Sequence, residues 1–225
     1  MSPAEHVKPI ERVPTSTLIA DQLREAIISG DFSQGDQVGE AHLAEQLGVS
    51  RGPLREAMQR LVQEGLLESV PHRGLFVVTL SEDDIRDIYV SRLAIETAAA
   101  LEIMKHPDVE ASTRRLDRSL QRLAHAAERG TPRAISEADA AFHELLVEES
   151  GSPRLQRMAS TLLVETRMCL KALADIYVAP RDLAQEHAVI VDAIRAGDRS
   201  ATIEVMRVHM HDSVSRLVPI PVGEW

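Results

Sequence analysis

Two short amphipathic segments separated by a very tight turn constrain the fold of this chain more than any other feature of its sequence. Residues 40–48 (EAHLAEQLG) and residues 50–61 (SRGPLREAMQRL) both place apolar side chains at helical spacing. Gly48 ends the first segment and Ser50 begins the second, so only Val49 lies between them. Two helices joined by a short turn that contains glycine form a helix-turn-helix. The sequence therefore predicts this motif.

The second of these segments carries two arginines close to its start. Four apolar residues at helical spacing are expected to form its buried face: Leu54, Ala57, Met58 and Leu61. Arg51 and Arg55 then lie on the outer face, and Ser50 is expected to cap the helix by accepting a hydrogen bond from the Gly52 amide. The first residues of a recognition helix contact base edges, and arginine is well suited to read guanine. The segment predicts a DNA-reading helix, with ordinary surface charges as the alternative.

The residues before this motif predict one further helix. Thr15 is expected to start it and Gly30 to end it, with an apolar stripe of Leu18, Ile19, Leu23, Ala26 and Ile27. Residues 31–38 (DFSQGDQV) are expected to form a loop, and residues 1–14 a mobile tail.

The residues after the motif predict a β-hairpin. The apolar runs LLESV and LFVVTL flank the turn sequence PHRG at residues 71–74, which places His72 and Arg73 at the tip of the hairpin. Such a basic tip can reach an adjacent groove or a phosphate, as the wing of a winged helix-turn-helix does. The order of these elements favours DNA binding over the alternative of ordinary surface charges.

The overall charge limits how the chain can bind DNA. The net charge is −10, and residues 1–80 alone hold 7 Lys and Arg against 11 Asp and Glu. An acidic protein repels phosphate groups at long range. We therefore expect the basic residues to be concentrated on one small face, and a second copy of the chain to contribute to binding.

The sequence also indicates where the protein is found. Cys169 is the single cysteine, which excludes a disulfide framework and fits a reducing compartment. The N-terminus has no apolar signal region, and no apolar run approaches 18 residues. We expect a cytoplasmic protein that does not bind a membrane.

The remainder of the chain reads as an all-α antiparallel helical bundle. Proline and glycine boundaries divide it into segments at residues 81–105, 109–129, 132–149, 153–176, 180–196 and 199–217. Ser81 opens the first with a capping-box pattern, SEDD, and Thr131-Pro132 opens the third. The predicted fold is therefore mostly α, with a winged part over residues 15–80 and a bundle over residues 81–225.

Histidine and aspartate within this bundle have the spacing of metal ligands. Asp139 and His143 lie four residues apart in DAAFH, and His187 and His209 lie on two later helices. Carboxylate with imidazole suits zinc or another first-row transition metal such as nickel or manganese. With nine histidines in the chain, chance pairing is the alternative that spacing alone leaves open.

The first part of the chain resembles the winged helix-turn-helix of the GntR family of bacterial transcription regulators. The similar run is LREAIISGDFSQGDQV, LAEQLGVSRGPLREAMQRLVQEGLLE and RGLFVV. The resemblance implies that Ser50, Arg51 and Arg55 face DNA, together with Arg73 and Gly74 of the wing. Many members have an arginine near the start of the second helix, whereas this chain has Ala41 and His42.

The bundle resembles the FCD effector domain of the FadR-like subgroup. The similar motifs are DAAFH, EHAVIVDAIRAGD and MRVH. The resemblance implies a divalent metal ion bound by one aspartate and three histidines: Asp139, His143, His187 and His209. It also implies that Arg92, in YVSRLAIE, meets the carboxylate of a bound ligand. His211 is expected to lie on another face of its helix.

These features lead to one function and two alternatives. The chain is expected to be a homodimeric regulator, a repressor rather than an enzyme, that binds a pseudo-palindromic operator and responds to a small organic acid. In the first alternative the metal is purely structural. In the second, a metal-dependent hydrolase uses open metal positions to activate water. The hydrolase lacks a general base at a suitable spacing, because Glu144 and Glu186 are expected to turn away from the ligands.

Overall fold

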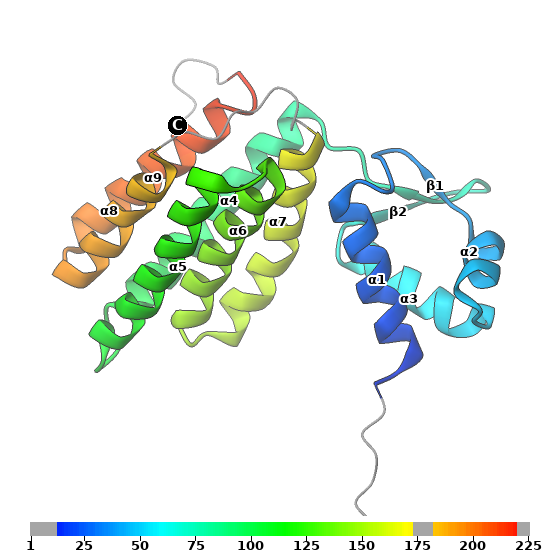
Figure 1. Ribbon diagram of the computed structural model, residues 1–225, viewed down its shortest axis with the longest axis horizontal. Coiled ribbons are helices and arrows are strands. Elements are labelled where there is room, and N and C mark those ends of the chain that lie inside the picture. The colour runs from blue at the N-terminus through cyan, green and yellow to red at the C-terminus, as the bar shows by residue number, and fades with distance from the viewer. Residues whose placement is uncertain (1–12, 173–181, 220–225) are drawn as a thin grey trace, which may run out of the picture.

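The computed structural model describes residues 13–172 and 182–219, in two parts that lie side by side (Figure 1). We call residues 13–80 the N-terminal lobe, and residues 82–172 with 182–219 the bundle. The lobe contains α1 (Thr15–Ser29), β1 (Gln37–Val38), α2 (Glu40–Leu47), α3 (Arg51–Gln63), β2 (Leu67–Val70) and β3 (Gly74–Val77). The bundle contains α4 (Glu82–Ile103), α5 (Val109–Arg129), α6 (Pro132–Glu149), α7 (Pro153–Ala172), α8 (Leu183–Ala196) and α9 (Arg199–Ser215). The predicted mostly-α class is confirmed.

The N-terminal lobe contains the predicted helix-turn-helix. Gly48 ends α2 in the left-handed conformation, and the buried residues of α3 are the four that the sequence predicted: Leu54, Ala57, Met58 and Leu61. Along α1, Ile19, Leu23 and Ile27 are buried as predicted, whereas Leu18 is 56% exposed. Successive residues of a helix are rotated by about 100°, so a stripe centred on Ile19 and Leu23 turns Leu18 outward.

The sheet has one strand more than the sequence predicted. The strand order is β1-β3-β2 with antiparallel pairing throughout, and Gln37 and Val38 pair with Phe76 and Leu75. The expectation that residues 31–38 form only a loop was therefore wrong. Two residues are too few to show the alternation by which a strand is recognised, and the partner strand is far away in the sequence.

The predicted hairpin joins β2 to β3. Leu67 pairs with Val77 and Val70 with Gly74, so the turn lies at residues 71–73. His72 has a φ of 61° and is the one residue other than glycine, among those described, with a positive φ. Histidine tolerates this region better than bulky or β-branched residues do, which suits it to the tip of a tight turn.

The six bundle helices begin largely where the sequence predicted. Ser81 and Asp84 form the capping box that starts α4, and Thr131 caps α6 by accepting from the Ala134 amide. The described part of α7 ends at Ala172, and the predicted extension to residue 176 lies outside the described residues, as does the predicted start of the next helix at Pro180. No described helix has the length and apolar character needed to cross a bilayer.

The two parts share packing through α7, the helix on the side of the bundle that faces α1 in Figure 1. Met168 is 3% exposed and packs into the hydrophobic core of the N-terminal lobe, with Val164 against the same core. The next residue, Cys169, belongs to the core of the bundle instead. One turn of α7 thus contributes to both cores.

Candidate functional site

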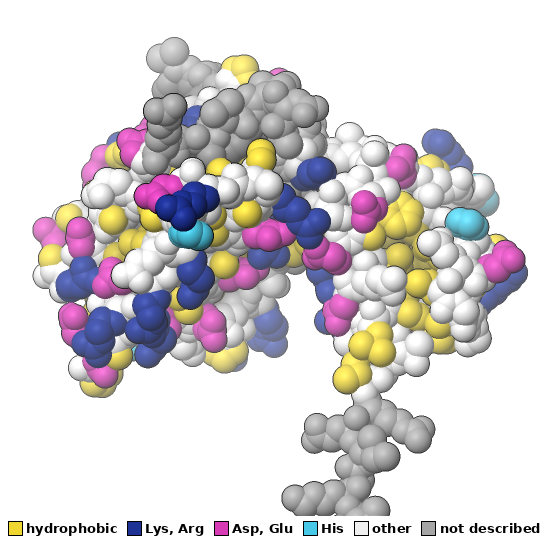
Figure 2. Space-filling model, in the orientation of Figure 1, with side chains coloured by type: hydrophobic (Ala, Val, Ile, Leu, Met, Phe, Trp, Pro, Cys, Tyr) yellow, Lys and Arg dark blue, Asp and Glu magenta, His cyan; other side chains and the backbone are white. Residues whose placement is uncertain are grey.

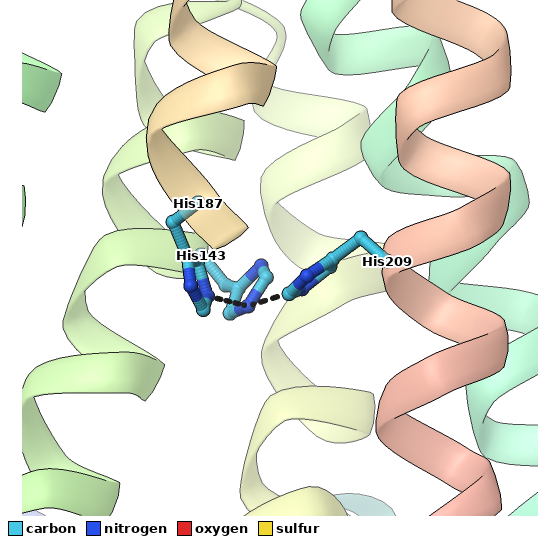
Figure 3. Close-up of side chains that lie close together, drawn as sticks. All are labelled: His143, His187 and His209. Atoms are coloured by element: carbon cyan, nitrogen blue, oxygen red, sulfur yellow. Dashed lines mark hydrogen bonds between the residues drawn. The ribbon is translucent and has the colours of Figure 1, made fainter. Parts of the chain in front are cut away.

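Three histidines from three helices converge in the interior of the bundle (Figure 3). His143 comes from α6, His187 from α8 and His209 from α9, and all three are at most 6% exposed. One nitrogen of each lies within 4.8 Å of the others. The Nε2 atom of His143 is 3.2 Å from that of His187 and 3.4 Å from that of His209. The structure therefore brings together residues that are 66 positions apart in the sequence.

Hydrogen bonds on the far side of two rings determine where their protons lie. The Nδ1 atom of His143 is 2.6 Å from a Glu96 carboxylate oxygen, and that of His187 is 2.7 Å from the Leu183 carbonyl oxygen. Both partners only accept, so both Nδ1 atoms carry the proton and donate. In the neutral rings each Nε2 atom then carries a lone pair, and these two lone pairs face one another. Histidines that bind a metal through one ring nitrogen usually donate a hydrogen bond from the other ring nitrogen to a carboxylate or a carbonyl.

The carboxylate of Asp139 lies against the same lone pairs. Its Oδ1 atom is 3.1 Å from Nε2 of His187. Burial alone would raise the pKa of Asp139, but the hydrogen bond and positive charge that His187 supplies when both of its ring nitrogens carry protons, with His143 and Arg92, hold that pKa well below its usual range. Burial, together with the other two imidazoles, holds the pKa of His209 far below its ordinary value. In the absence of a proton on Nε2 of His187, the carboxylate and the imidazole lone pairs would repel one another, and a metal ion relieves that repulsion as a proton does. One carboxylate and three imidazoles are a donor set that fits a transition-metal ion.

Arg92 lies next to this cluster and is 2% exposed. Its Nε atom donates to Glu96 at 2.8 Å and its Nη1 atom to Thr166 at 3.4 Å, whereas its Nη2 atom has no partner among the described residues. Burial opposes the charge of Arg92, but Glu96 and Tyr89 outweigh it and raise its pKa. A buried guanidinium with one unpaired corner is suited to bind an anion.

Glu96 is a site residue that the sequence analysis missed. It is 1% exposed, and its two carboxylate oxygens accept from Arg92 and His143, one each. Burial would raise its pKa, but Arg92 and His143 outweigh burial and lower it. The four-residue spacing of Arg92 and Glu96 in RLAIE was the signal that could have pointed to it.

A cavity of about 660 Å³ opens onto the cluster. Arg92, Asp139 and His143 all line it, as do residues from α1, α6 and α7. Glu144 and Glu186, the carboxylates nearest in sequence to the proposed ligands, pair with Arg167 and Arg216. They are held apart from the cluster, as the sequence analysis expected. His211 is exposed and lies beside Asp212.

The residues expected to face DNA lie on a separate surface, at the start of α3 and on the wing. Ser50 and Arg51 are exposed, but the side chain of Ser50 makes no capping hydrogen bond, so the predicted cap on Gly52 was wrong. The backbone of Ser50 is extended, and α3 begins without a side-chain partner. Arg55 is 65% exposed and donates to Glu40 of α2 at 2.7 Å, a pairing that the sequence analysis did not foresee.

The wing presents its expected residues. Arg73 lies over the ring of Phe76 at 5.0 Å, and its carbonyl oxygen accepts from the Gln37 side chain of β1. His72 is exposed at the tip, and Gly74 starts β3 with a φ of 102°. On the face shown in Figure 2, basic and acidic side chains are intermixed over both parts. That face has no broad basic surface, in keeping with the net charge of −10.

A winged helix-turn-helix joined to a helical bundle with a buried histidine centre defines a class of two-part DNA-binding regulators. Residues 15–77 match the family model of bacterial regulatory proteins of the gntR family, and residues 87–212 match that of the FCD domain. The chain therefore belongs to the GntR family and carries an FCD domain. Because the family consists of transcription regulators, the expectation of a regulator rather than an enzyme is confirmed.

Individual relatives agree with this assignment. A probable D-xylose utilization operon transcriptional repressor of Paenarthrobacter nicotinovorans is 32% identical over 204 residues, which cover 87% of each chain. The gluconate operon transcriptional repressor of Bacillus subtilis is 26% identical over 211 residues, covering 90% of this chain and 85% of the relative. The crystal structure of a GntR regulator from Rhodococcus sp. RHA1 has the same fold, with a TM-score of 0.78 at 24% identity over 95% of this chain and all of the other.

Proposed function

We propose that this regulator is a repressor whose affinity for its operator is controlled by a small organic acid, bound beside a divalent metal ion in the bundle. Asp139, His143, His187 and His209 would hold the ion. The observation that carries the proposal is the convergence of three Nε2 atoms and the Asp139 carboxylate, a donor set that suits a transition-metal ion. Bound there, a transition metal with four protein ligands keeps up to two positions for ligand oxygens.

The effector would bind between this centre and Arg92. The unpaired Nη2 atom of Arg92 and the cavity that Arg92 shares with Asp139 and His143 support a carboxylate at this place. The relatives named as repressors of D-xylose utilization and gluconate operons support repression and a ligand from carbohydrate metabolism. The helix that carries Arg92 starts at Glu82, soon after β3 of the wing, so a ligand bound there acts on an element continuous with the N-terminal lobe.

The DNA surface would consist of Ser50, Arg51 and Arg55 on α3 with His72, Arg73 and Gly74 on the wing. Two copies of this surface in a homodimer would read a pseudo-palindromic operator, which compensates for the acidic charge of each chain. To regulate, the acid must bind the DNA-free and DNA-bound arrangements with different affinity.

A pair of arginine variants on α3 tests the DNA surface. Operator fragments are first selected from genomic DNA with the full-length protein, and affinity is then measured by fluorescence anisotropy. Losing one bidentate guanine contact costs about 1–3 kcal/mol, so Arg55→Ala is expected to weaken binding by about 5- to 150-fold. Arg60→Ala, at the other end of the same helix and paired with Glu64, is the control and should change little. Equal affinities of the two variants would contradict the assignment.

Metal analysis and ligand binding test the bundle. We expect about one divalent ion per chain, loss of the ion in His187→Ala, and retention in His211→Ala, the exposed control. A panel of hydroxy, keto and sugar acids should then bind metal-loaded protein and release the operator. Arg92→Lys keeps a cation beside Glu96 but loses the planar fork, so it should weaken acid binding. Metal without any acid response would favour a purely structural metal.

A further inference from the structure

The cavity beside the histidine centre extends across the boundary between the two parts of the protein. Arg92 and His143 of the bundle line it, and so do Ile28 and Ser29. Those two residues are at the end of α1, just before Gly30, and belong to the N-terminal lobe. A molecule that fills the cavity therefore touches the DNA-binding part directly.

One cation that lines the cavity next to the end of α1 has no compensating charge among the described residues. Lys171 of α7 lines the cavity, is exposed, and makes no ion pair or hydrogen bond with the described residues. Its stem lies against Gly30, because a Cβ atom placed on Gly30 would be 2.5 Å from Cε of Lys171. The last carbonyls of a helix carry partial negative charge, so Lys171 is attracted to the end of α1.

Two other cations that line the cavity are already partnered. Arg133 donates to Glu137 and to Glu25 of α1, and Arg167 donates to Glu144 through Nη2. The Nε atom of Arg167 is buried and has no partner among the described residues. The full charge of Lys171 and one N–H of Arg167 are thus available to an anion in the cavity.

The size of the cavity bears on what fills it. A volume of about 660 Å³ lies in the range of pockets that hold drug-sized ligands. A two- or three-carbon acid anchored at Arg92 would leave most of this space to water. A longer molecule with anions at both ends would use Arg92 at one end and Lys171 at the other.

We propose that the effector carries a second anionic group, a carboxylate or a phosphate, and that Lys171 binds it at the interface with α1. This inference rests on the proposed function, since it assumes an acid anchored at Arg92. Binding of the second anion draws Lys171 away from Gly30 and the carbonyl end of α1. The second anionic group of the effector then changes a contact between the bundle and the N-terminal lobe.

Acids that share a six-carbon chain and differ in the terminal group test the proposal. Gluconate ends in a hydroxyl, glucarate in a carboxylate and 6-phosphogluconate in a phosphate, and hexanoate with adipate repeats the comparison without hydroxyls. Binding to metal-loaded, full-length protein is measured by isothermal titration calorimetry. We expect at least one of the doubly anionic acids to bind at least tenfold more tightly than its singly anionic partner, and the tighter of glucarate and 6-phosphogluconate identifies the second group.

Two lysine variants test whether Lys171 causes that preference for doubly anionic acids. Lys171→Met removes the charge but retains an unbranched stem, and should abolish the preference without weakening the singly anionic acid. Lys105→Met is the control, because Lys105 is exposed and pairs with Glu102 elsewhere on the bundle. The inference is overturned if both kinds of acid bind the wild type equally, or if the preference survives in Lys171→Met. In either case, acid binding that depends on Arg92 still supports the proposed function. Failure of all five acids to bind overturns the inference, whereas the proposed function is decided by the wider panel of hydroxy, keto and sugar acids.

Discussion

The ion pair of Arg55 with Glu40 gives one side chain two competing partners. Arg55 lies on the surface expected to face DNA, and its guanidinium must leave the Glu40 carboxylate to contact a base. Glu40→Gln removes the competitor together with one negative charge near the phosphates. We expect this variant to bind the operator several-fold more tightly than the wild type in low salt, as measured by fluorescence anisotropy.

A second glutamate on the same helix separates the two contributions. Glu45 is exposed and makes no ion pair among the described residues, so Glu45→Gln removes an equal charge without releasing Arg55. A larger gain for Glu40→Gln than for Glu45→Gln supports competition for Arg55. Weaker binding of Glu40→Gln than of the wild type would instead mean that Glu40 positions the guanidinium for DNA.

At the scale of residues, the sequence pointed to the candidate site where chemistry and spacing coincide. Asp139 and His143 share one helix face at four-residue spacing, and the structure places both beside the shared cavity. Glu96 was missed because a glutamate four residues after an arginine is a common surface pattern, and only tertiary packing buries this one. The pairing of Arg55 with Glu40 was missed because it joins two helices.

At the scale of elements, helix α7 carries Glu165, a carboxylate that is partly buried and lies near other negative charges. Burial, together with the charges of Asp84 and Asp87, raises the pKa of Glu165 above its ordinary value. Its Oε1 atom would lie 2.8 Å from a Cβ atom on Gly65, so it stands against the turn after α3. A raised folded pKa contributes stability that is present at acid pH and is lost as pH rises through the folded pKa.

Glu165→Gln keeps the shape of the side chain and removes the charge. At pH 7 we expect the variant to melt about 1–4 °C above the wild type, because ionisation no longer costs stability. Near pH 4 the carboxyl is largely protonated in both the folded and the unfolded protein, so the difference in melting temperature should nearly disappear. A gain in melting temperature of equal size at both pH values would assign the effect to packing rather than to charge.

Elements differ in how well their own sequence identifies them. Helix α3 was predicted with its buried stripe because thirteen residues repeat the apolar period several times. Strand β1 has two residues and exists because β3 offers an unpaired edge, so its identity depends on a segment nearly forty residues away. The left-handed residue that ends α1 was predictable, since Gly30 is the residue type that this conformation favours.

For the whole molecule, the shared packing of α7 predicts that damage to the bundle spreads to the winged lobe. Met168→Ala removes a buried side chain from the core of the N-terminal lobe and is expected to cost about 2–5 kcal/mol. Hydrogen exchange should show faster opening of α1 than of α8 in this variant. Met158→Ala, on the same helix at a residue that is 57% exposed, is the control. Uniform loss of protection in both parts would contradict the assignment of Met168 to the core of the N-terminal lobe.

The same turn of α7 has a practical consequence for building new sensors. Regulators of this kind invite recombination, in which the DNA-reading half of one protein is fused to the ligand-sensing half of another. A crossover at residue 80 separates α1 from Val164 and Met168, and leaves a foreign side chain in a cavity shaped for methionine. A functional hybrid has to transplant the matching surface of α7 with the winged half, so the exchangeable module is discontinuous in the gene.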